Sequence, residues 1–290
     1  GRQAHGSIAR TGYEEDRFMA NTLLQMYGKC GSAQDARLVI FLAMPRKNVV
    51  SWTALMAAYA RNGHSKEAVR AFRSMNLEGE RPNEVTVVTL LQSISSISRD
   101  SSAGMIAAMA AEFPQSLLVG NAILSFYSKL GDLELARSVF RAMPTRDTIS
   151  FNAMIAGHAQ NGRSLDALFF AREMRIEGIA PDSASFTSIL WACGHAGLLR
   201  EGWMEFVGMG ADFEIAPGVE HFACVADLLG RGGRVAEAEE LVQSMPFEPD
   251  YVSWTGLLDA CRSDSDRERA RDAAQQMRAL RPEKSSPYVL

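Results

Sequence analysis

The sequence is poor in several features, and each absence narrows the class of protein. Aromatic residues are only 8% of the 290 residues, and the four cysteines lie far apart with no CxxC pair (Cys30, Cys193, Cys224 and Cys261). This cysteine usage argues against a disulfide scaffold and fits a reducing compartment. The net charge is −4, from 30 Lys+Arg and 34 Asp+Glu, which argues against nucleic-acid binding through bulk positive charge alone. No apolar run approaches the roughly 18 residues that a membrane helix needs, so no membrane partner is predicted.

Motifs for catalysis and metal binding are also missing. The five histidines do not cluster, and HxE, HExxH, paired CxxC, P-loop and GxSxG motifs are absent. The zinc deaminase signature, HxE with PCxxC, is absent as well. The glycine cluster at 230–233 is more typical of a turn between helices than of a phosphate cradle. The sequence therefore predicts no enzymatic activity, no metal site and no cofactor.

Internal repetition is the strongest positive feature of the sequence. Hydrophobic residues make up 47%, which indicates a folded chain. The segment NTLLQMYGKCGSAQDAR, which begins at Asn21, is similar to the segment NAILSFYSKLGDLELAR, which begins at Asn121. The dipeptide Met-Pro occurs three times, at intervals of 99 and 102 residues. A unit of 31 to 36 residues is thus nested in a larger unit of about three repeats.

Each unit has the pattern of two helices and a turn. In residues 117–147, apolar residues recur at helical spacing, Gly131 ends the first helix, Asp132 caps the second, and Pro144 stops it. One hairpin cannot bury its apolar face alone, so neighbouring hairpins must stack. The sequence therefore predicts an all-α fold, a right-handed α-solenoid superhelix of stacked helix-turn-helix repeats with a concave surface lined by first helices.

Several segments, among them YGKCGSAQDAR, NVVSWTALMAAYARNGHSKEAVRAF, ACGHAGLLREG and VEHFACVADLLGRGGRVAEAEELVQSMPFEPD, give the chain a family resemblance. Over essentially its whole length the chain resembles the plant pentatricopeptide-repeat (PPR) family, in its PLS class, where P-, L- and S-type repeats alternate. The resemblance implies these boundaries: a partial L-type repeat 1–16, S-type 17–48, P-type 49–83, degenerate L-type 84–116, S-type 117–147, P-type 148–182, last L-type 183–218, last S-type 219–250, E motif 251–284, and the truncated start of a second E motif 285–290. The S-type repeat 17–48 has one extra residue near Ile40.

The family resemblance implies that each repeat reads one base of single-stranded RNA with its fifth and last residues. Asn offers both a donor and an acceptor to a pyrimidine edge, and a short Thr hydroxyl leaves room for a purine. The regular pairs are Asn21/Asn48, Thr53/Asn83, Asn121/Asp147 and Asn152/Asp182. The irregular pairs are Val88/Ser116, Thr187/Gly218 and Ala223/Asp250. The expected specificity is 5′-Y-A-N-U-U-N-N-3′, with RNA parallel to the chain. The second residue of each repeat supplies an apolar wedge between bases: Phe18, Val50, Val85, Leu118, Ile149 and Ala184.

Structural roles compete with these assignments. Asn21, Asn121 and Asn152 could be helix N-caps, a role that Asn favours. Their recurrence at one repeat phase, with Asp147 and Asp182 at another, favours recognition. Trp52, Phe151 and Trp254, one position earlier, are predicted to be core residues.

The resemblance implies a sequence-specific RNA-binding factor for C-to-U editing in a mitochondrion or chloroplast. The E motif would recruit editing-complex proteins or a deaminase, which would lie downstream or on a partner. Two alternatives stay open: a factor for organellar RNA stabilisation or splicing, and a protein-binding scaffold like the tetratricopeptide repeats.

Overall fold

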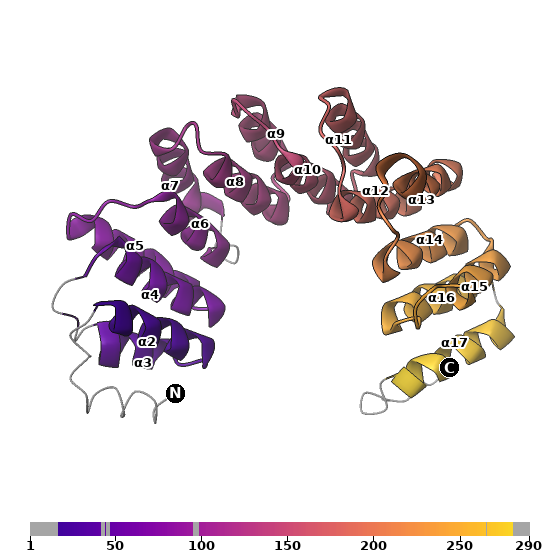
Figure 1. Cartoon of the computed structure of the whole chain (residues 1–290), viewed down its shortest axis with the longest axis horizontal. Helices are drawn as coiled ribbons and strands as arrows, with labels where there is room; N and C mark the ends of the chain where they lie inside the picture. Colours follow the sequence, from indigo (N-terminus) through magenta and orange to yellow (C-terminus); the bar gives the residue numbers. More distant parts are fainter. Residues whose placement is uncertain (1–16, 42–43, 45–46, 95–98, 265, 281–290) are drawn as a thin grey trace. The chain divides into compact units, whose positions relative to one another are not determined.

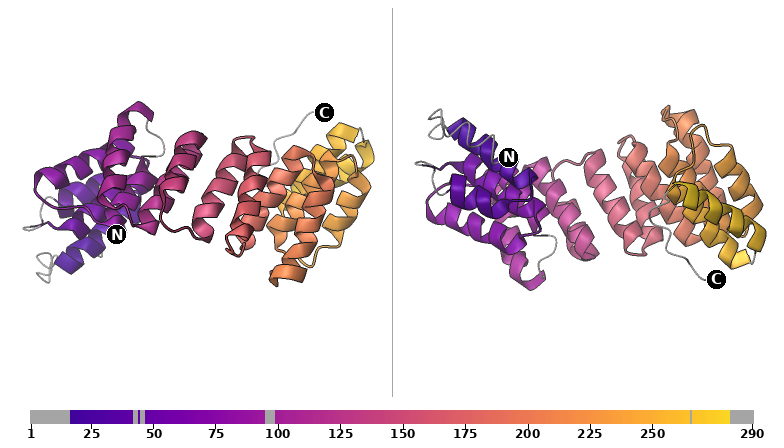
Figure 2. Two further views of the ribbon diagram at one scale, coloured as in Figure 1. Left: turned by 90° about the horizontal axis from the view of Figure 1, so that it is seen from above. Right: turned by 90° about the horizontal axis from the view of Figure 1, so that it is seen from below.

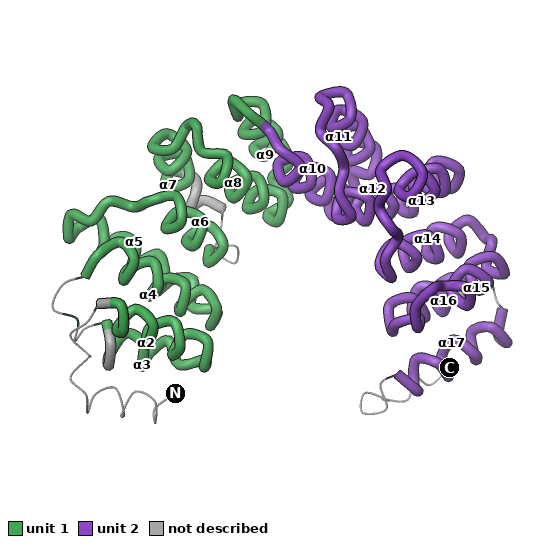
Figure 3. Tube along the Cα trace, in the orientation of Figure 1, with its two compact units in different colours: residues 1–145 green, residues 146–290 purple. Residues whose placement is uncertain are grey.

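The computed structural model describes residues 17–41, 44, 47–94, 99–264 and 266–280 (Figure 1). These residues fall into two compact units, 1–145 and 146–290 (Figure 3). All of the regular elements among the described residues are helical. The predicted partial repeat at 1–16 and the second E motif at 285–290 lie outside the described residues.

The first unit is a stack of helical hairpins. Its first helices α2, α4, α6 and α8 contact one another in chain order, and most are followed by a second helix that packs against them. The elements are α2 (Arg17–Lys29), α3 (Ala33–Asp35), η2 (Ala36–Phe41), α4 (Val49–Arg61), α5 (Ser65–Leu77), α6 (Glu84–Ser93), α7 (Arg99–Glu112), α8 (Leu117–Leu130) and α9 (Leu133–Ala142).

The second unit repeats this arrangement. Its first helices α10, α12, α14 and α16 also contact one another in order. The colours of Figure 2 follow these helices along the chain in two further views. Its helices are α10 (Thr148–Gln160), α11 (Ser164–Ile176), α12 (Ser183–Ala196), α13 (Leu199–Phe213), α14 (Val219–Arg231), α15 (Val235–Gln243), α16 (Tyr251–Asp264) and α17 (Arg267–Leu280). The predicted all-α solenoid of stacked hairpins is thereby confirmed. None of the described helices is both long and apolar enough to span a membrane.

The turn inside a hairpin follows from glycine and a capping carboxylate. Gly131 ends α8 in the left-handed conformation, with φ 75°, which favours glycine. The Asp132 side chain then accepts a hydrogen bond from the Leu135 N–H at 3.4 Å and starts α9. Both predictions from the sequence are confirmed, and α9 ends at Ala142, two residues before Pro144.

The place where the 17–48 segment is expected to carry an extra residue coincides with a change of helix type. The backbone of Ala36–Phe41 forms a π-helix, in which hydrogen bonds close over one more residue than in an α-helix. A π-helical turn absorbs an insertion without shifting the faces of the flanking turns. The expected insertion near Ile40 lies in this turn.

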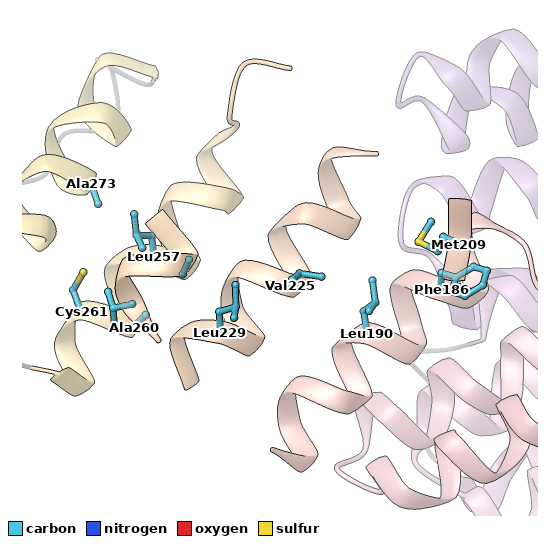
Figure 4. Packing of buried hydrophobic residues seen from close by; sticks show 11 residues of the cluster. Phe186, Leu190, Met209, Val225, Leu229, Leu257, Ala260, Cys261 and Ala273 are labelled. Carbon is cyan, nitrogen blue, oxygen red and sulfur yellow. The ribbon is translucent and has the colours of Figure 1, made fainter. Parts of the chain in front are cut away.

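The core lies between the helices of successive hairpins. In the second unit, Phe186 and Leu190 of α12, Leu229 of α14 and Leu257 of α16 belong to one buried cluster (Figure 4). A Cβ on Gly230 would lie 2.3 Å from the Ala260 Cβ, so α14 and α16 approach closely there.

The predicted core aromatics occupy the expected place. Trp52 and Phe151 are 4% and 0% exposed, which confirms the core assignment. Trp254 is partly buried and packs against the same cluster as Leu257. The sequence pattern therefore separates core residues from the polar residues that follow them.

Candidate nucleic-acid interface

The last residue of a predicted repeat stands directly before the first helix of the next one. There its side-chain oxygen accepts a hydrogen bond from the backbone N–H three residues later, at 2.8–3.0 Å, and from the hydroxyl of that same residue, at 2.8–3.1 Å. This N-cap geometry satisfies an N–H that the helix leaves free. The capping residues and their partners are Asn48 with Ser51, Asn83 with Thr86, Asp147 with Ser150, Asp182 with Ser185, and Asp250 with Ser253.

The capping alternative raised for three asparagines is therefore wrong for those residues. Asn21, Asn121 and Asn152 lie within α2, α8 and α10, in the second turn of each helix. A side chain at this depth cannot reach the first free N–H groups. The caps belong to the repeat-end residues instead, and the asparagines remain available for other contacts.

Asn152 and Asp182, one of the predicted pairs, touch in the structure. The Asn152 Nδ2 donates to Asp182 Oδ1 at 3.0 Å, and the single O–H of Ser185 is shared between Asn152 Oδ1, at 2.5 Å, and Asp182 Oδ1, at 2.9 Å. Burial alone would raise the pKa of Asp182. Hydrogen bonds from the Ser185 N–H, the Asn152 amide and the Ser185 hydroxyl outweigh burial, so this pKa lies below its ordinary value. The ionised carboxylate only accepts, and it therefore fixes which end of the Asn152 amide faces it.

Thr53 and Asn83, another predicted pair, are linked through a third residue. Thr53 Oγ1 lies 2.8 Å from Thr86 Oγ1, and the Thr86 hydroxyl contacts Asn83 Oδ1 at 2.9 Å. Thr53 also donates to the Val49 carbonyl at 2.7 Å. The hydroxyl of Thr53 is therefore held at both sides.

Thr187 also contacts the third residue of the following repeat, which here is His221. Its Oγ1 lies 3.2 Å from His221 Nε2, while the repeat-end residue Gly218 has no side chain to offer. We call Thr86, Ser185 and His221 the bridging residues, because each contacts the fifth residue of the preceding repeat. The sequence reasoning missed them. Their signal is a Ser or Thr three residues after a repeat-end Asn or Asp, with His221 as the exception.

The predicted wedge residues point into solvent. Five of them are 49–76% exposed, despite being apolar: Phe18, Val50, Val85, Leu118 and Ile149. Ala184 is exposed as well. Val252 holds the equivalent place in α16 and is 62% exposed, a residue that the sequence reasoning did not name. In α14 the same position is Glu220.

An open groove in the second unit is lined by predicted base-reading residues and by a predicted wedge residue. It has a volume of about 580 Å³ and is lined by the predicted base-reading residues Asp182 and Thr187 and the predicted wedge residue Ala184, together with Ser183, Ser188 and Glu220. The groove runs over the N-terminal turns of α12 and α14. Polar groups and an apolar side chain thus line one hollow.

The remaining predicted residues are more enclosed. Asn121 is 8% exposed, and Asn21 is half-buried with an Oδ1 that has no hydrogen-bond partner in the described part of the chain. Val88 is half-buried and has no polar side-chain group. Among the described residues, no His, Cys, Asp and Glu side chains gather into a group that could hold a metal ion.

These helical hairpins, with their capped first helices, define an α-solenoid repeat protein. A model described as the PPR repeat family matches residues 47–95 and 146–195, and a PPR repeat model matches 121–147. The chain belongs to the pentatricopeptide-repeat family.

Known proteins resemble the chain along its whole length. The Arabidopsis thaliana pentatricopeptide repeat-containing protein CRR2, chloroplastic, is 37% identical over 294 residues, covering 100% of this chain and 45% of the relative. A mitochondrial pentatricopeptide repeat-containing protein of the same plant is 34% identical, covering 100% of the chain and 52% of the relative. The chain thus spans about half the length of these relatives.

Solved structures share the fold. The crystal structure of PPR10 in complex with an 18-nt psaJ RNA element aligns with a TM-score of 0.75 at 22% identity, covering 96% of this chain and 42% of that chain. A tetratricopeptide repeat protein from Parabacteroides merdae aligns with a TM-score of 0.54 at 12% identity, covering 81% of this chain and 94% of that chain.

Proposed function

We propose that the chain binds single-stranded RNA in a sequence-specific manner, with one base facing each repeat. The observation that carries the proposal is the arrangement around Asn152, where Asp182 and Ser185 fix the amide close to two exposed wedge residues, Ile149 and Ala184. A base seated between two wedges would meet the amide edge on. PPR10, which shares the fold, was crystallised in complex with an RNA element, and this agrees with the assignment.

The hydrogen-bond capacity of Asn152 matches uracil. An amide has two N–H donors and two acceptor lone pairs. Asp182 takes one donor and Ser185 takes one lone pair, so one donor and one acceptor are left for a ligand. The uracil edge offers an N3–H donor beside the O4 acceptor, which complements this remaining pair. The repeat 148–182 is therefore assigned to uracil.

A threonine in the same place favours a larger base. Thr53 carries a hydroxyl that is shorter than the Asn amide and is held by Val49 and Thr86. The additional room suits a purine, and the pair Thr53/Asn83 is assigned to adenine. Together the repeats read 5′-Y-A-N-U-U-N-N-3′.

Binding to short RNAs tests the proposal. Fluorescence anisotropy with the 290-residue chain would compare an RNA carrying Y-A-N-U-U, the same bases scrambled, and a DNA copy, all at one salt concentration. We expect preference for the matched RNA and a shallow salt dependence, because the 30 Lys+Arg are outnumbered by 34 Asp+Glu and the net charge is −4. Equal binding to all three, or no binding, would contradict the proposal; capture of a peptide in place of RNA would favour a scaffold function.

A recoding variant tests the residue assignment. Asn152→Thr combined with Asp182→Asn reproduces the Thr53/Asn83 pair and should change the preferred fifth base from U to A. Asn76→Thr makes a similar chemical change on the exposed end of α5 and should leave the preference unchanged. A folded double variant that still prefers U would refute the assignment at this repeat.

We further propose that the chain is a PLS-class specificity factor for organellar C-to-U editing. The last S-type repeat, 219–250, would lie nearest the edited cytidine, and the hairpin α16–α17 within the predicted E motif would recruit a deaminase or other editing proteins. The names of the relatives, chloroplastic for one and mitochondrial for another, support an organelle. Complementation of an editing-deficient plant line tests this role. Restored transcript abundance or splicing without restored editing would favour the stabilisation or splicing role instead.

A further inference from the structure

His221 is the one bridging residue that is neither Ser nor Thr. It is the third residue of α14 and its side chain is completely buried, at 0% exposed. The residue before α14 is Gly218, which has no side chain that could cap the helix or face a base. The imidazole of His221 therefore lies at the junction between α12 and α14, where Gly218 supplies no repeat-end side chain.

The hydrogen bonds of His221 fix its protonation pattern. The Gly218 backbone N–H donates to Nδ1 at 2.9 Å, so Nδ1 is an acceptor and carries no proton. The proton of the neutral ring is then on Nε2. That nitrogen lies 2.9 Å from the Ser183 carbonyl oxygen and 3.2 Å from Thr187 Oγ1, with the Ser183 hydroxyl at 3.4 Å. The ring thus directs a donor across the junction at the first turn of α12.

This donor and the Ser183 carbonyl together fix the hydroxyl of Thr187. The Thr187 O–H donates to the Ser183 carbonyl at 3.1 Å, and the single Nε2–H of His221 is shared between that carbonyl, at 2.9 Å, and the Thr187 oxygen, at 3.2 Å. The proton of Thr187 is therefore directed into its own helix, and the hydroxyl oxygen has an acceptor lone pair left. Thr187 lines the open groove with Ala184 and Glu220, so this lone pair is available to a ligand there.

We propose that His221 is a positioning residue that gives the repeat 183–218 a preference for adenine through Thr187, in place of the missing Gly218 side chain. The inference rests on the proposed RNA binding. A short side chain leaves room for a purine, and an acceptor at its tip complements the exocyclic amino group of adenine. Guanine presents the O6 acceptor at the same place and is disfavoured.

Four RNAs that differ only in the sixth base, Y-A-N-U-U-X-N, test the proposal. By anisotropy titration, wild type should bind X = A about 3- to 10-fold more tightly than X = G or U, the range of one hydrogen bond. His221→Ala should abolish this preference and keep the preference for U at the fifth base. His221→Gln, which retains an acceptor and a donor, should restore part of the sixth-base preference. Ser185→Ala, the matched change one junction earlier, should weaken discrimination at the fifth base and leave the sixth unaffected.

The outcomes separate this inference from the proposed function. If wild type discriminates at the fifth base and not at the sixth, the role of His221 is refuted while RNA reading stands. If a folded His221→Ala variant keeps its preference for adenine, the ring has a structural role only and the inference is also refuted. Loss of discrimination at every base would refute both. Should His221→Ala unfold by circular dichroism, Thr187→Ala takes its place: it must lose the preference for adenine, and the inference fails if it does not.

Discussion

Asp182 has two roles in the structure, and two substitutions separate them. Its carboxylate caps α12 through the Ser185 N–H, at 2.8 Å, and it holds the Asn152 amide, at 3.0 Å. Asp182→Ala removes both contacts. Asp182→Asn retains an oxygen that can cap the helix but replaces the carboxylate that orients the amide.

The expected size of the effect follows from the cap. Replacing a capping Asp by Ala costs about 1 kcal/mol, within a range of roughly 0.5–2, whereas Asn caps about as well as Asp. We expect Asp182→Ala to lower the free energy of local opening at the start of α12 by about that amount, and Asp182→Asn to change it by a few tenths at most. Both variants should lose part of the preference for U at the fifth base.

Hydrogen exchange at the Ser185 amide is the appropriate assay, because stacked repeats open locally and do not unfold in a single all-or-none step. A loss of about 1 kcal/mol corresponds to roughly fivefold faster exchange. Asp272→Ala, on the exposed face of α17, is the matched control and should leave exchange at Ser185 unchanged. Unchanged exchange in Asp182→Ala would refute the capping argument, and equal acceleration in both variants would show that charge dominates.

The stabilisation that the Asp182 carboxylate contributes should decrease as the pH falls. Burial alone would raise the pKa of Asp182, but hydrogen bonds from Ser185 and Asn152 lower it on folding. The stabilisation by the carboxylate is therefore complete above the unfolded-state pKa and is lost as the pH falls through the folded-state pKa. Any advantage of wild type over Asp182→Asn should shrink as the solution is acidified.

Three further predictions concern packing and exposure. Ile149→Ala should weaken binding of matched RNA up to roughly fivefold, because an aliphatic wedge contributes less than an aromatic one. Ile176→Ala, at a still more exposed isoleucine at the end of α11, should leave anisotropy titrations unchanged. Gly230→Ala should overpack the contact between α14 and α16 and speed hydrogen exchange of their amides, by an amount that corresponds to about 1–3 kcal/mol. Unchanged exchange would contradict the close approach of the two helices, and Gly210→Ala, with open space around it, is the control. Burial, followed by nearby acidic side chains, raises the pKa of the Cys224 thiol to about 12, so a thiol reagent at pH 8 should label Cys224 in urea only. Because Cys30 is exposed, labelling is read at each cysteine by peptide mass spectrometry, and labelling of Cys224 in the folded protein at the rate seen in urea would refute this.

The sequence predicts most of the fold because each helix boundary is encoded locally. Gly131 and Asp132 carry the backbone freedom and the capping oxygen that a turn requires, and both act as predicted. The burial of Phe151 follows from its helical spacing. These features depend on neighbouring residues in the chain and not on contacts with other repeats, so they can be predicted from one sequence.

The site was predicted less completely, because its contacts depend on stacking. The pairing of Asn152 with Asp182 was implied by the family resemblance, but the link through Ser185 was not. That link exists only because the next helix lies within hydrogen-bond distance. His221 was missed for the same reason: in the sequence it is an isolated histidine, and its role is visible only beside Thr187 and Gly218.

The placement of caps at repeat ends has a consequence for how such a protein evolves. Helix starts favour Asn, Asp, Ser, Thr and Gly, and every repeat-end residue from 48 to 250 falls within this set: Asn48, Asn83, Ser116, Asp147, Asp182, Gly218 and Asp250. If the repeat-end residue is the second base-reading position, as proposed, helix capping limits the residue types available there. A substitution of Asn by Asp, or of Asp by Asn, keeps a good capping residue and so preserves the start of the helix. Under the proposed function, a lineage can follow a drifting RNA target one repeat at a time without passing through an unstable ancestor.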